Sequence, residues 1–107
     1  MVATAGELAQ HARIAVTRGW FSDTLPAFRP AAPIAVLRMD GDWYDSTRCI
    51  LDQLWSKLAP GALVIVDDYY DWDGCARALH DFLSANDRPE RIRQSWIAGL
   101  AHLIRMP

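Results

Sequence analysis

Two short apolar segments, each followed by aspartates, constrain the fold of this chain more than any other feature. Residues 34–39 run Ile-Ala-Val-Leu-Arg-Met and lead into Asp40, and residues 62–66 run Ala-Leu-Val-Ile-Val and lead into Asp67 and Asp68. Apolar runs of this length, bounded by turn residues, are typical of strands buried on both faces. We therefore expect two strands in the interior of a sheet.

A helix is predicted between these two strands. Asp45 or Ser46 can cap its start, because their side-chain oxygens accept hydrogen bonds from unpaired backbone N–H groups. Lys57 suits its last turn, and Pro60 and Gly61 are expected to end it. Its apolar face is expected to hold Ile50, Leu51, Leu54, Trp55 and Leu58.

A second helix is predicted after the second strand, capped by Asp71 or Asp73. Its apolar face is expected to hold Cys75, Leu79, Phe82 and Leu83. Residues 91–96 and 100–106 then form an expected antiparallel hairpin around Ala98 and Gly99. An earlier strand is predicted over residues 12–17, followed by a proline-containing linker over residues 26–33.

Strands that alternate with helices of this length pair in parallel through right-handed crossovers. The predicted fold is α/β, a mostly parallel sheet that closes with an antiparallel hairpin. A length of 107 residues fits a single domain over residues 1–107.

Composition excludes several functional classes. The net charge of -2 and a pI near 5.8 argue against a nucleic-acid surface. The sequence has neither an apolar run of about 20 residues nor a secretory signal pattern, so we expect a cytoplasmic protein. Cys49 and Cys75 fall among apolar residues of the predicted helices and are expected to be buried thiols.

The aspartates that follow the two strands form a candidate metal site. Ligands of open α/β sheets bind beyond the carboxyl ends of the strands, where these side chains would converge. Such carboxylates repel one another unless a proton or a cation lies between them, and hard oxygen ligands select Mg²⁺, Ca²⁺ or Mn²⁺. Aspartate also ends strands as a turn former, and Asp45 or Asp68 could simply cap a helix.

Three motifs resemble the macrocin O-methyltransferase family, whose members methylate sugar hydroxyls of antibiotics. Residues 19–26 (GWFSDTLP) resemble its GWFxDTLP element, residues 37–47 (LRMDGDWYDST) its LRxDGDxYxST, and residues 64–69 (VIVDDY) its VIVDDY. The resemblance extends over residues 12–107. It implies the C-terminal part of a Rossmann-like methyltransferase sheet that lacks the first two strands.

The resemblance also implies roles for particular residues. Asp40, Asp67 and Asp68 would bind Mg²⁺ or another hard divalent cation. Asp42 would act as the general base toward a sugar hydroxyl of a natural product in antibiotic biosynthesis. S-adenosylmethionine would be the methyl donor, with Gly19, Trp20 and Phe21 in its binding site.

The glycine-rich turn that holds the cofactor in this class of enzyme has no counterpart here, because no two of the six glycines lie closer than 13 positions. In family terms the sequence begins just before the third strand. We therefore expect a truncated or split enzyme, doubtful in activity alone, that forms a homo-oligomer or binds a partner chain supplying the glycine-rich half. The alternative is a non-catalytic metal-binding or assembly module. Tyr69, Tyr70 and Trp72 could line an acceptor pocket or pack on the core.

Overall fold

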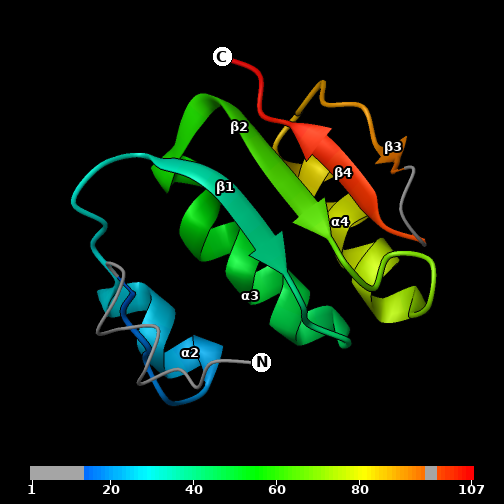
Figure 1. Cartoon of the computed structure of the whole chain (residues 1–107). Coiled ribbons are helices and arrows are strands. Elements are labelled where there is room, and N and C mark those ends of the chain that lie inside the picture. The colour runs from blue at the N-terminus through cyan, green and yellow to red at the C-terminus, as the bar shows by residue number, and fades with distance from the viewer. Residues whose placement is uncertain (1–13, 96–98) are drawn as a thin grey trace, which may run out of the picture.

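The computed structural model describes residues 14–95 and 99–107 as a four-stranded sheet with two helices on one face (Figure 1). The strand order is β1-β2-β4-β3. The elements are α2 (Phe21–Thr24), η1 (Leu25–Ala27), β1 (Ile34–Met39), α3 (Tyr44–Leu54), η2 (Trp55–Lys57), β2 (Leu58–Val66), α4 (Asp73–Ala85), β3 (Arg93–Gln94) and β4 (Ala101–Ile104).

The predicted partial α/β sheet, with a parallel pair and a closing antiparallel hairpin, is confirmed, but among the described strands only one of the three pairs is parallel. Strands β1 and β2 pair in parallel through the α3 crossover, and β4 pairs antiparallel with both β2 and β3. Met39 is opposite Val66 in the parallel pair, so both strands end at the same edge of the sheet. That edge is where the two acidic loops begin.

The core lies between the sheet and helices α3 and α4. Side chains on the inner face of β2 and β4 are fully buried, among them Val64, Val66 and Leu103. The apolar residues expected on the two helical faces are all buried: Ile50, Leu51, Leu54, Trp55, Leu58, Cys75, Leu79, Phe82 and Leu83. Burial of this continuous apolar surface is the main force that holds the helices on the sheet.

The prediction that both strands are buried on both faces is wrong within the described residues. In β1 only Met39 is buried, and Val36, on the opposite face, is 57% exposed. The cause is that α3 and α4 both pack on the same face and leave the other one open. Apolar side chains on that open face include Val36, Leu63, Ile65 and Ile104.

The predicted helix ends differ from the observed ones. Trp43 and Trp72 occupy the positions before α3 and α4, and neither helix has a side-chain cap hydrogen bond. The expected capping residues Asp45 and Asp73 lie inside the first turns, where a carboxylate still favours the positive end of the helix dipole.

Pro60 and Gly61 lie in β2 and do not end α3, because α3 stops at Leu54 and η2 leads straight into the strand. Pairing with β1 skips from Leu58 to Leu63, and this irregular stretch accommodates the missing N–H of proline.

The strand predicted over residues 12–17 does not form over its described part. Residues 14–17 have no regular structure, and Ile14 and Val16 are 39% and 69% exposed, so no neighbouring strand satisfies their backbone. Residues 12, 13, 96 and 98 of the predicted strands and turn lie outside the described residues. The closing hairpin is confirmed but shorter than predicted. None of the described helices has the length and apolar character that a membrane crossing requires.

Candidate functional site

Two loops leave the carboxyl edge of the sheet side by side. The first joins β1 to α3 and carries Asp40 and Asp42, and the second joins β2 to α4 and carries Asp67 and Asp68. The Asp67 N–H donates to the Met39 carbonyl at 3.0 Å, which extends the parallel pairing by one step and fixes the starting points of both loops.

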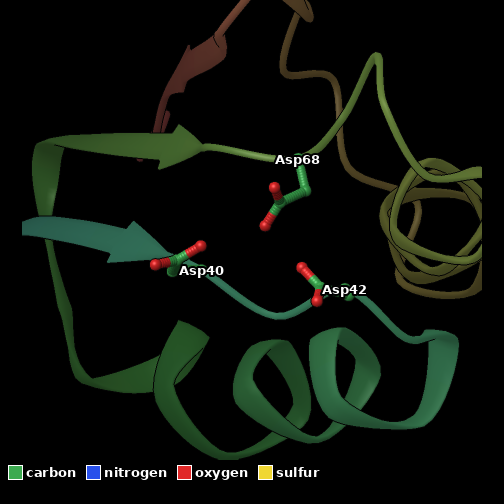
Figure 2. A group of neighbouring side chains, drawn as sticks. All are labelled: Asp40, Asp42 and Asp68. Atoms are coloured by element: carbon green, nitrogen blue, oxygen red, sulfur yellow. The ribbon is translucent and has the colours of Figure 1, made fainter.

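Three of the four aspartates converge. One carboxylate oxygen from each of Asp40, Asp42 and Asp68 lies within 4.8 Å of the others. Figure 2 shows the three side chains pointing from the two loops into a common space. Asp40 and Asp42 are exposed, whereas Asp68 is half-buried. We call this group the acidic cluster.

Asp68 is the member least satisfied by protein contacts. Its Oδ2 atom is buried and has no hydrogen-bond partner among the described residues. Burial, together with the neighbouring Asp40 and Asp42 carboxyls, raises the pKa of Asp68 to about 6. A buried carboxylate oxygen that faces two like charges needs either a proton or a cation.

The first acidic loop is held by Thr47, a buried residue of the motif at residues 37–47 to which the sequence analysis assigned no role. Thr47, in the first turn of α3, donates a hydrogen bond from its Oγ1 to the Gly41 carbonyl at 3.0 Å, and it is fully buried. Gly41 is tightly enclosed, because a Cβ atom there would lie 3.3 Å from the Ser46 Cβ. This contact fixes the backbone between Asp40 and Asp42. The signal available in the sequence was the motif of residues 37–47, which ends on Thr47.

Asp67 is oriented differently from the acidic cluster. Its Oδ2 lies 3.2 Å from an Arg38 guanidinium nitrogen, and the arginine side chain is 62% exposed. The Asp67 side chain is 20% exposed, but because the guanidinium lies mostly in water the pair contributes about 0–1 kcal/mol. The structure therefore brings together Asp40, Asp42 and Asp68, and leaves Asp67 beside them in an ion pair.

The residues proposed from the resemblance to contact the cofactor lie at α2. Trp20 is 80% exposed and lines, with Phe21, Asp45, Ser46 and Cys49, a hollow of about 190 Å³. Gly19 adopts a φ of +137°, and a Cβ there would lie 2.9 Å from Thr24 Cγ2, so the turn before α2 requires glycine. Gly19 lies outside this hollow.

The aromatic residues of the second loop divide between core and surface. Tyr69 is half-buried, and its hydroxyl lies 2.6 Å from His80 Nε2 on α4. Tyr70 and Trp72 are 49% and 47% exposed. Cys75, in α4, is a buried thiol as predicted, and burial raises its pKa. Cys49, in α3, was also predicted to be buried but is only half-buried.

Known proteins resemble this chain in sequence. An O-methyltransferase of 8-demethyl-8-(2,3-dimethoxy-alpha-L-rhamnosyl)-tetracenomycin-C from Streptomyces olivaceus, acting at the 4'-position, is 50% identical over 64 residues, which are 60% of this chain and 24% of the relative. Demethyldecarbamoylnovobiocin O-methyltransferase from Streptomyces niveus is 46% identical over 69 residues, 64% of this chain and 26% of the relative. The chain thus spans about a quarter of the length of these curated relatives.

Solved structures also resemble it. The O-methyltransferase NovP superposes with a TM-score of 0.75 and 37% identity, over 83% of this chain and 36% of that structure. CalS11, a TDP-rhamnose 3'-O-methyltransferase of calicheamicin biosynthesis, gives a TM-score of 0.70 and 26% identity, over 92% and 44%. The predicted partial methyltransferase fold is thereby confirmed. The family description Macrocin-O-methyltransferase (TylF) matches residues 7–100, and the chain belongs to this family.

Proposed function

We propose that this chain provides the metal-binding and proton-accepting part of an S-adenosylmethionine-dependent O-methyltransferase that acts on a sugar hydroxyl of a natural product. The observation that carries the proposal is the buried, unpartnered Oδ2 of Asp68 facing two further carboxylates. The named relatives, which methylate antibiotics or a nucleotide sugar, support the reaction and the class of acceptor.

A hard divalent cation, Mg²⁺ by preference, fits the donors of this site. Carboxylate oxygens are its preferred protein ligands, and a cation would offset both the burial of the Asp68 carboxylate and its repulsion by Asp40 and Asp42, which together raise the pKa of Asp68. We propose Asp40, Asp67 and Asp68 as its ligands. Asp67 would have to leave its exposed ion pair with Arg38, at a cost of only about 0–1 kcal/mol.

Asp42 is the proposed general base. It lies in the acidic cluster and is exposed, so an acceptor hydroxyl can approach it from solvent. Its carboxylate would accept the hydroxyl proton, and the chain would also orient the acceptor oxygen. S-adenosylmethionine would supply an electrophilic methyl group.

Only part of the cofactor site can belong to this chain. The exposed Trp20 and the adjacent Phe21 could pack on an adenine ring, with Gly19 shaping the turn before them. The sequence has no glycine-rich turn, and we propose that a partner chain supplies the main cradle of the cofactor.

We propose that a second copy or a partner chain with the glycine-rich half covers the open face of the sheet. The apolar side chains of Val36, Leu63, Ile65 and Ile104 on that face support this, as does the unpaired outer edge of β1 among the described residues. Sedimentation velocity of this chain alone tests the second copy: association that Val36→Asp abolishes is expected, and a monodisperse monomer at high concentration would contradict it.

Calorimetric titration with Mg²⁺ at pH 8 tests the metal site. We expect one site per chain in the wild type, loss of binding in Asp68→Asn, and retention in Asp71→Asn. Asp71 is a matched control, because it is an exposed aspartate of the same loop that lies outside the acidic cluster. Equal binding by Asp68→Asn and the wild type would refute the site.

A non-catalytic metal-binding or assembly module is the second candidate, favoured by the missing glycine-rich turn. Titration with S-adenosylhomocysteine in the presence of Mg²⁺ separates the two. Binding of S-adenosylhomocysteine supports the enzyme. The module is supported if the chain binds Mg²⁺ but no S-adenosylhomocysteine, and if adding the glycine-rich half as a separate chain does not change this.

A further inference from the structure

We propose that Trp43 and Trp72 form an aromatic platform that binds the apolar face of the acceptor's sugar ring. The two indoles are 69% and 47% exposed, and their ring centroids are 6.1 Å apart with an angle of 42° between the planes. Large aromatic side chains usually gain stability by burial, so an exposed pair in mutual contact indicates a surface with another use.

The platform is joined to the acidic cluster through the backbone. Trp43 directly follows Asp42, and the Trp72 N–H donates to the Asp68 carbonyl at 3.0 Å. One indole therefore comes from each acidic loop, and the pair spans the two loops just beyond the aspartates.

The platform is also rigidly supported. A Cβ atom at Gly74 would lie 2.9 Å from the Tyr44 backbone nitrogen, so only glycine lets the start of α4 approach the start of α3 this closely. The Tyr44 hydroxyl donates to Asp81 Oδ2 at 2.8 Å, and the Arg77 guanidinium lies 5.9 Å from the Tyr44 ring centroid. These contacts hold the two loops together before any ligand binds, which reduces the entropic cost of binding.

The chemistry of the two neighbouring surfaces matches a sugar. A pyranose has hydroxyl groups around its rim and patches of C–H bonds on its faces. Carboxylates, with or without a cation, bind the hydroxyls, while an aromatic ring packs against the C–H patches and attracts them through its electron-rich face. This inference rests on the proposed methyl transfer to a sugar, and it assigns the residues that would recognise the ring.

Saturation-transfer NMR with methyl α-L-rhamnopyranoside as the probe tests the platform in the intact chain. Transfer from protein to the ring C–H protons is expected in the wild type. Trp43→Ser and Trp72→Ser should each weaken binding about two- to tenfold, and Trp43→Phe should retain most of it. Phe28→Ala is the matched control, because Phe28 is also exposed but lies beside Lys57, at the opposite end of the strands.

Absence of saturation transfer in the wild type would overturn the platform. Transfer in the two Trp→Ser variants that equals transfer in the wild type would overturn it as well. A phenyl compound that carries no sugar should give no saturation transfer that is lost in Trp43→Ser. Mg²⁺ titration of the same samples separates the two proposals. If the wild type binds Mg²⁺ but shows no transfer to the sugar, the platform is refuted and the metal site is not. If the wild type does not bind Mg²⁺, the metal site is refuted, with or without transfer to the sugar.

Discussion

Replacing Asp68 by asparagine should stabilise the metal-free protein at pH 8. The three clustered carboxylates have oxygens within 4.8 Å of one another, and the variant removes the repulsion of Asp68 with both neighbours. At this separation each pair of charges costs about 0.9 kcal/mol in water and about 3.5 kcal/mol at an effective dielectric constant of about 20. Asp40 and Asp42 are exposed, so the lower value applies, and the total gain is about 2 kcal/mol.

The pH dependence of this gain follows from the pKa of Asp68. Its folded-state pKa of about 6 is above the ordinary value of 3.8. A raised carboxyl pKa contributes stability below the ordinary value, and that contribution is lost as the pH rises through about 6. The wild type is therefore penalised fully at pH 8, roughly half as much at pH 5, where the unfolded chain is already ionised, and hardly at all at pH 3, where both states are protonated.

Thermal unfolding with a chelator present measures the effect. We expect Asp68→Asn to raise Tm by at least about 5 °C at pH 8 and to change it little at pH 3. Saturating Mg²⁺ should then raise the Tm of the wild type but not of the variant, since a ligand at 100 times its Kd stabilises by about 2.7 kcal/mol. A variant that is equally destabilised at both pH values would refute the reasoning and make Asp68 a structural residue.

Three further perturbations test other parts of the account. Asp67→Asn should abolish Mg²⁺ binding in calorimetry and Asp42→Asn should not, whereas the reverse result would make Asp42 a ligand. Thr47→Val should lower the free energy of unfolding by about 1–3 kcal/mol and weaken Mg²⁺ binding, because it leaves a buried carbonyl unpaired; an unchanged Mg²⁺ affinity would show that the loop needs no such tether. Gly74→Ala should cost about 1–3 kcal/mol in denaturant unfolding, because its Cβ would clash with the Tyr44 backbone, and a neutral result would contradict the close approach.

The parallel pair, its crossover helix and the closing hairpin could be predicted from the sequence, because they depend on local periodicity and on turn residues. The bounds of β1 match the prediction, and so do the buried faces of both helices. Local sequence pattern could not show whether residues 12–17 form a strand. Whether Ile14 and Val16 join a sheet depends on a neighbouring strand, which local pattern does not reveal.

The acidic cluster was predictable in part. That Asp40 and Asp68 meet follows from two parallel strands that end at one edge. That Asp42 joins them while Asp67 turns to Arg38 depends on side-chain orientation, which alternates along a strand and changes in the loop. The contact between Trp43 and Trp72 was hidden because their separation of 29 positions is closed only by the packing of α3 and α4.

The central claim is that the acidic cluster holds a hard divalent cation, and anomalous scattering from crystals soaked in Mn²⁺ tests it most directly. The account predicts one strong anomalous peak between the carboxylates of Asp40 and Asp68, absent from crystals of Asp68→Asn. Crystals of the wild type that show no peak at the cluster at saturating Mn²⁺, or a peak that persists there in Asp68→Asn, would contradict it.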